Sequence, residues 1–71
     1  MAKRYLIVIE KGARNYSVFS PDLPGCVATG RTRRKAVLQM SEAINLHLCG
    51  LKADGMKVPR AQSAAKYVTI S

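Results

Sequence analysis

The amino-acid sequence predicts an α+β fold of order β-β-β-α-β, in which one antiparallel sheet carries a single long helix on one face. Two patterns support this fold. Runs rich in β-branched and aromatic residues, typical of strands, fill much of positions 4–30 and recur at positions 66–70. Between them, residues 33–53 repeat apolar side chains at the three- and four-residue spacing of a helix. One helix packed across a sheet is the simplest way for such elements to bury their apolar surfaces.

The predicted strands have apolar surface that one helix cannot cover. They lie at residues 4–10, 16–20, 26–30 and 66–70. In the first strand Tyr5, Ile7 and Ile9 point to one face, and Leu6 and Val8 point to the other. A strand that is apolar on both faces is normally covered on both, so the open face predicts a partner protein or a second copy. We therefore expect a homodimer or higher homo-oligomer, with Tyr5, Ile7 and Ile9 as candidate partner-binding residues.

The predicted helix has clear end signals and a second apolar sector. Thr32 is a good N-cap, and Asp54-Gly55 provides a C-terminal stop. The stripe that should face the sheet consists of Val37, Met40, Ile44, Leu48 and Leu51, widened by Ala36 and Ala43. Leu38 and Leu46 project away from this stripe. They are either ordinary exposed apolar residues or a second partner-binding surface.

The stretch SPDLPGC, residues 20–26, predicts a rigid corner formed by Pro21, Asp22, Leu23, Pro24 and Gly25. Pro24-Gly25 fits a type II turn, because proline presets φ at the second position and glycine supplies a positive φ at the third. Asp22 cannot bond the backbone N–H of Pro24, which has none. We expect its carboxylate to cap the turn through the N–H of Gly25 or Cys26, which is a structural role.

The charge balance favours anionic partners. Twelve Lys and Arg residues against four Asp and Glu residues give a net charge of +8. Four cations gather at the start of the helix and form a candidate anion-binding site: Arg31, Arg33, Arg34 and Lys35. Nucleic acid or an acidic protein would suit such a site, and a merely soluble basic surface would look the same. The charge is therefore compatible with nucleic-acid binding but does not specifically indicate it.

The sequence predicts no catalytic site, no metal site and no cofactor. Metal-dependent nucleases need carboxylates that converge, and the four acids are widely spaced. His47 and Cys49 lie two positions apart, on different sides of a helix, so they do not form a metal-ligand pair. No apolar run reaches the ~18 residues of a membrane span. The run Tyr5–Ile9 is too short for a signal peptide, so we expect a cytoplasmic protein that is not associated with a membrane.

Three stretches, NYSVFSPDLPGCVATG, EAINLHLCGLKADGMKVP and KYVTI, resemble the HicB family of antitoxins. The resemblance runs from about Tyr5 to Ile70. It implies a partial RNase H-like fold with the strand and helix order already described. It also implies a non-catalytic module that binds and occludes a HicA-type toxin, a small ribonuclease that cleaves messenger RNA.

Two features differ from the family pattern. Many HicB proteins add a C-terminal DNA-binding domain, whereas we expect this chain to be one HicB-like domain over residues 1–71 without such an addition. Family members usually open the helix with acids, and here the opening reads Thr32-Arg33-Arg34-Lys35. The alternative function is therefore a small basic nucleic-acid-binding protein that uses the Arg31–Lys35 cluster.

Overall fold

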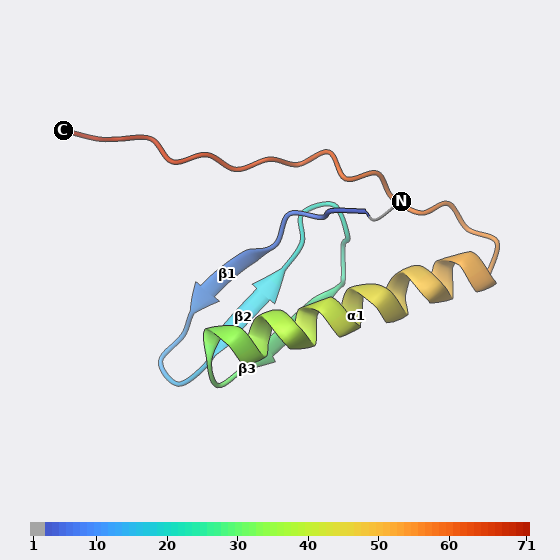
Figure 1. Ribbon diagram of the computed structural model, residues 1–71, viewed down its shortest axis with the longest axis horizontal. Coiled ribbons are helices and arrows are strands. Elements are labelled where there is room, and N and C mark those ends of the chain that lie inside the picture. Colours follow the sequence, from blue (N-terminus) through green and yellow to red (C-terminus); the bar gives the residue numbers. More distant parts are fainter. Residues whose placement is uncertain (1–2) are drawn as a thin grey trace.

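The computed structural model, which describes residues 3–71, has three antiparallel strands followed by one long helix (Figure 1). The strands are β1 (Val8–Lys11), β2 (Tyr16–Phe19) and β3 (Val27–Gly30), and they lie in the order β1-β2-β3. The helix α1 spans Arg33–Ala53. The predicted α+β fold is thus confirmed.

The strands are shorter than predicted, and β1 most of all. It begins at Val8, which pairs with Phe19, instead of at residue 4. The reason is that β2 ends at Phe19, where the corner begins, so the residues before Val8 have no partner on β2.

The pairing register sorts the strand residues onto two faces. Ile9, Val18 and Ala28 lie opposite one another, and Val18 is buried under α1. The neighbouring row Val8, Phe19 and Val27 therefore points to the other face, because side chains alternate along a strand. Within residues 3–71 no helix or strand lies on that second face (Figure 1).

Both ends of α1 are fixed by local hydrogen bonds. The Lys35 N–H donates to Thr32 Oγ1 at 3.1 Å, which confirms Thr32 as the N-cap. At the other end Gly55 has φ +69°, its N–H donates to the Lys52 carbonyl, and the Met56 N–H donates to the Leu51 carbonyl. This pair of bonds is a Schellman motif, which ends the helix where the sequence predicts.

The core lies between α1 and the last two strands. Its buried apolar residues are Val18, Leu23, Cys26, Ala36 and Met40. The helix approaches β3 closely at Gly30, where an added Cβ would lie 2.4 Å from the Ala36 nitrogen. Since α1 packs chiefly on β3 and β2, the helix-facing side of β1 is only half covered.

Residues after α1 form an extended tail that runs back along the β1 side of the sheet (Figure 1). The predicted strand at 66–70 has no strand neighbour in the described chain. A strand exists only through hydrogen bonds to a neighbour, and this segment continues past the sheet into solvent. Within residues 3–71, no helix has both the length and the apolar character needed to cross a membrane.

Candidate functional site

The corner at residues 20–26 has the turn that its sequence predicts. The Cys26 N–H donates to the Leu23 carbonyl at 3.1 Å across Pro24-Gly25, and Gly25 has φ +82°. A positive φ at the third position defines the type II turn. Leu23 is fully buried in the core, so the corner is anchored to the fold by an apolar side chain.

Asp22 binds the C-terminal tail instead of capping the turn. Its Oδ2 accepts hydrogen bonds from the backbone N–H groups of Gln62 at 3.0 Å and Ser63 at 2.9 Å. Its Oδ1 accepts a third, from Ser63 Oγ, at 2.6 Å. The expected cap on Gly25 or Cys26 was therefore wrong, although the role of Asp22 is structural. We call this group of three hydrogen bonds the Asp22 clamp.

The Asp22 clamp favours the ionised carboxylate. The hydrogen bonds from Ser63, first from its side chain and then from its backbone, hold the pKa of Asp22 below its ordinary value. The Gln62 N–H adds to this effect, and partial desolvation opposes it. The clamp is therefore charge-assisted at neutral pH.

Two further hydrogen bonds hold the segment before β1 in place. The Tyr5 hydroxyl donates to the Pro59 carbonyl at 2.6 Å, which fixes the start of the tail beside the N-terminal segment. The hydroxyl of buried Ser20 donates to the Leu6 carbonyl at 2.8 Å. The corner, the N-terminal segment and the tail thus form one connected unit.

Three cavities lie around β1 and the segment before it, where α1 covers the sheet only in part. They have volumes of about 350, 430 and 370 Å³. Tyr5 and Ile7 line the first two, and Ile9 lines the third together with Tyr67 of the tail. The structure thus brings the predicted partner-binding residues Tyr5, Ile7 and Ile9 to one half-buried surface, which we call the β1 surface. They pack against the edge of the core on the helix-facing side, whereas the face that α1 leaves open carries Val8, Phe19 and Val27.

Leu38 and Leu46, the other predicted partner-binding residues, are exposed on α1 and lie outside the three cavities of the β1 surface. Leu38 lines a separate hollow of about 500 Å³ together with Arg31 and Lys35. The two proposed partner surfaces are therefore distinct.

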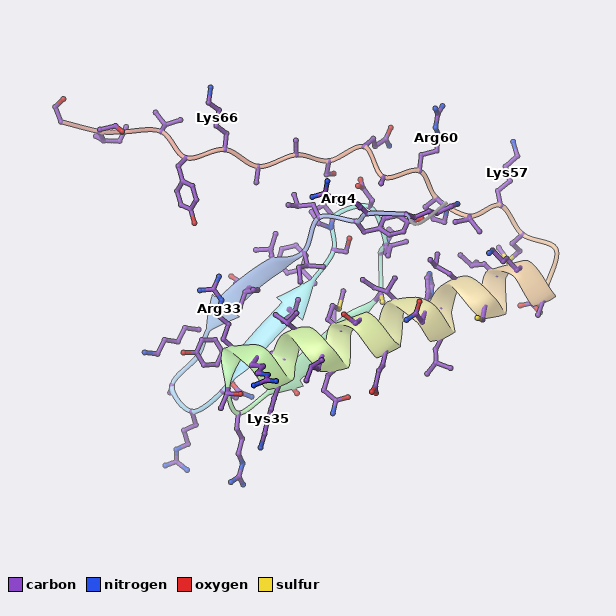
Figure 2. The ribbon with its side chains drawn as sticks, viewed as in Figure 1. Arg4, Arg33, Lys35, Lys57, Arg60 and Lys66 are labelled. Carbon is purple, nitrogen blue, oxygen red and sulfur yellow. The ribbon has the colours of Figure 1, made fainter. Side chains whose placement is uncertain are left out.

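The basic cluster Arg31, Arg33, Arg34 and Lys35 is exposed throughout. Figure 2 shows Arg33 and Lys35 at the first turn of α1, far from the labelled cations of the tail. In the same view Lys57, Arg60 and Lys66 project from the tail away from the sheet and helix. The cations labelled at the start of α1 and those labelled on the tail thus lie apart, and Arg4 lies on the segment before β1 (Figure 2).

The acidic side chains of residues 3–71 lie on separate elements. Among residues 3–71 no three His, Cys, Asp or Glu side chains come together in a way that could hold a metal ion. Glu10, Asp22, Glu42 and Asp54 lie on β1, in the corner, in mid-α1 and at its C-terminal end. Burial raises the pKa of the Cys26 thiol, which favours its unreactive protonated form.

Sequence reasoning missed the Asp22 clamp. The clamp joins residues 40 and 41 positions apart, and no periodic pattern reports such a contact. The one available signal was negative: Asp22 precedes Pro24 by two positions and so lacks its usual local donor.

Comparison with known proteins extends over almost the whole chain. A family model described as the HicB-like antitoxin of bacterial toxin–antitoxin systems matches residues 5–70. The chain is 38% identical, over 90% of its length, to a 14.9 kDa protein from the rep–hol intergenic region of Haemophilus phage HP1. It covers 48% of that phage protein, or about half its length.

Two relatives of similar size carry the family name UPF0150. One, from Thermoplasma acidophilum, is 36% identical over 80% of this chain and 84% of its own length. Another, from Helicobacter pylori, is 45% identical over 66% of this chain and 65% of its own length. No solved structure matches the chain.

Proposed function

Because this chain belongs to the HicB-like antitoxin family of bacterial toxin–antitoxin systems, we propose that it binds a HicA-type mRNA-cleaving toxin and occludes the toxin's active site. The observation that carries the proposal is the family match over residues 5–70, which includes the corner, α1 and the tail. A toxin partner follows from the family in general, and the HicA type is our inference from the resemblance of the corner and helix motifs.

Blocking a toxin's active site requires a binding surface and no catalytic residues on this chain. The β1 surface offers half-buried Tyr5, Ile7 and Ile9 next to open cavities, which is the mixture of apolar anchors and accessible space that protein partners use. The exposed Leu38 and Leu46 on α1 are the alternative surface. In this proposal the chain is not an enzyme, and it acts in the cytoplasm, where messenger RNA is the toxin's substrate.

Co-expression tests the proposal in cells. The proposal requires a HicA-type toxin gene beside this one; its toxin is induced with and without the chain, and growth is followed. We expect the toxin to arrest growth and the chain to restore it. If growth stays arrested although the chain is folded and abundant, the antitoxin proposal fails.

Two variants distinguish the candidate surfaces in the same assay. Ile7→Lys places a charge on the β1 surface, and Leu46→Lys makes the same apolar-to-lysine change on the exposed side of α1. We expect Ile7→Lys to lose rescue while Leu46→Lys keeps it, with circular dichroism confirming that both variants are folded. The reverse result would assign toxin binding to α1.

A second candidate function, nucleic-acid binding, is favoured by one observation: four exposed cations within five positions, Arg31, Arg33, Arg34 and Lys35. If the cluster contacts phosphates, affinity should fall with salt at a slope of about −0.7 to −0.9 per phosphate contacted. The double variant Arg34→Glu/Lys35→Glu should remove most of that affinity. Should it bind as well as the parent does, this second function loses its site.

A further inference from the structure

We propose that two copies of this chain exchange their C-terminal tails, so that Lys66–Ile70 of each copy forms a fourth strand on the outer edge of β1 of the other. This inference is independent of toxin binding. It depends on the tail, on the receiving edge and on the small core of the single chain.

The end of the tail, residues 66–70, has the composition of a strand but is exposed. The sequence KYVTI is rich in β-formers, yet Tyr67, Val68 and Ile70 are 101%, 73% and 84% exposed. The Asp22 clamp fixes the tail as far as Ser63, and beyond that point it extends past the sheet (Figure 1). The radius of gyration is 13.7 Å, whereas a compact domain of this length has about 11 Å.

The backbone of such a segment needs a hydrogen-bonding neighbour. An exposed apolar run in extended conformation is a template for pairing with another strand. The clamp fixes Gln62 and Ser63, just before this segment, which lowers the entropy cost of pairing the residues that follow.

The outer edge of β1 is the receiving edge that fits best. It is a free edge of the sheet, and α1 packs chiefly over the other two strands. A strand added there would place Val68 and Ile70 on the same face, next to the apolar side chains of β1 and the segment before it. The cavities of the β1 surface supply the space for these side chains.

The other free edge, that of β3, fits less well. α1 packs chiefly on β3, so a strand added at that edge would find the helix-facing side already covered. The tail itself also runs on the β1 side, where Tyr67 and Ile9 line one cavity.

The exposed side chains at the end of the tail are better explained by pairing with a second copy than by pairing with the sheet of the same chain. Among residues 3–71 the buried apolar core consists of five residues, and domains this small often depend on association for stability. Reciprocal exchange of the tails gives a closed dimer with two-fold symmetry, in which both tails are paired. Tail pairing within one chain would give the same strand without the association, so the test must separate the two.

The first measurement is the molar mass in solution by light scattering at micromolar concentration. We expect the parent to have twice the chain mass of 7.8 kDa. A truncation after Ala65 and the variant Val68→Lys should have the single-chain mass. The matched control Met56→Lys, which makes the same apolar-to-lysine change at an exposed residue just after α1, should keep the double mass.

The second measurement uses only the parent protein, so it stands even if a variant fails to fold. In a mixture of isotope-labelled and unlabelled copies, filtered NMR experiments should detect contacts between Val68 or Ile70 of one copy and Ile7 or Ile9 of another. A monomeric parent would overturn the proposal, as would a dimer that survives truncation or tail contacts found only within one copy.

Discussion

At the scale of single residues, Gly25 is the position where the corner depends on one backbone angle. Its φ of +82° is strained for any residue with a Cβ, although the space around it is open. Gly25→Ala should therefore lower the free energy of unfolding by about 1 kcal/mol or more, measured by urea denaturation.

Gly50 provides the matched control. It lies inside α1 with nothing near its missing Cβ, so Gly50→Ala should raise stability by about 1 kcal/mol through helix propensity alone. Equal effects of the two substitutions would contradict the assignment of the turn.

The Asp22 clamp predicts that acid releases the tail. Because the folded-state pKa lies below the ordinary value near 3.8, the clamp stabilises the fold fully above that value. The stabilisation is lost as pH falls through the lowered folded-state pKa. The amide signals of Gln62 and Ser63 in NMR spectra should shift over that acidic range.

Asp22→Asn is the control for this titration. An amide at position 22 keeps an acceptor oxygen but has no acidic proton, so the shift of Ser63 below about pH 4 should disappear. If Ser63 in Asp22→Asn still titrates as in the parent, another group is responsible for the tail's response to acid.

The two cysteines predict a simple difference in reactivity. Cys26 is buried and its pKa is raised, whereas Cys49 is exposed. A thiol reagent at neutral pH should modify Cys49 rapidly and Cys26 only upon unfolding. Cys49→Ser should abolish the fast reaction, and a fast reaction that remained would show that the corner opens readily.

At the scale of elements, the start of α1 is destabilised by its own charges. Arg33, Arg34 and Lys35 oppose the helix dipole, by about 0.3–1 kcal/mol each when exposed. Arg34→Glu/Lys35→Glu should make two of these charge–dipole interactions favourable and let position 35 complete a capping box with Thr32. A gain of about 1 kcal/mol corresponds to a rise in Tm of about 4–8 °C, measured by calorimetry.

A lower Tm for this double variant would contradict the account of the helix start. The cations would then have favourable partners in the folded assembly, and the cluster would be a contact between subunits.

Local signals made α1 and the corner predictable from the sequence. Thr32, the apolar stripe and Gly55 each act through residues a few positions away, and the helix has the expected bounds. The tail could not be predicted in this way. Its place depends on Asp22 and Ser63, far apart in sequence, and on a neighbouring strand that one chain does not provide.

The candidate site was predictable only in part. The alternation of Tyr5, Ile7 and Ile9 indicates a shared face, and the structure places all three along open cavities. The alternation could not show that this shared face is the one α1 packs on, because which face of the sheet the helix covers depends on contacts between residues far apart in sequence.

At the scale of the whole molecule, we propose that the clamped tail and the β1 surface both serve binding. Both lie on the same side of the sheet, so tail exchange and toxin binding can influence each other. Truncation after Ala65 should therefore change toxin affinity, measured by calorimetric titration, more than Leu46→Lys does. Equal affinities for parent and truncated chain would place the toxin on a surface away from the tail.

We propose that the chain neutralises a HicA-type ribonuclease by binding it. RNA cleavage by the purified toxin, followed as increasing amounts of this chain are added, tests this directly. We expect cleavage to fall to background at a fixed molar ratio, and the chain alone to leave the RNA intact. Undiminished cleavage at a large molar excess of folded chain, or RNA cleavage by the chain itself, would contradict it.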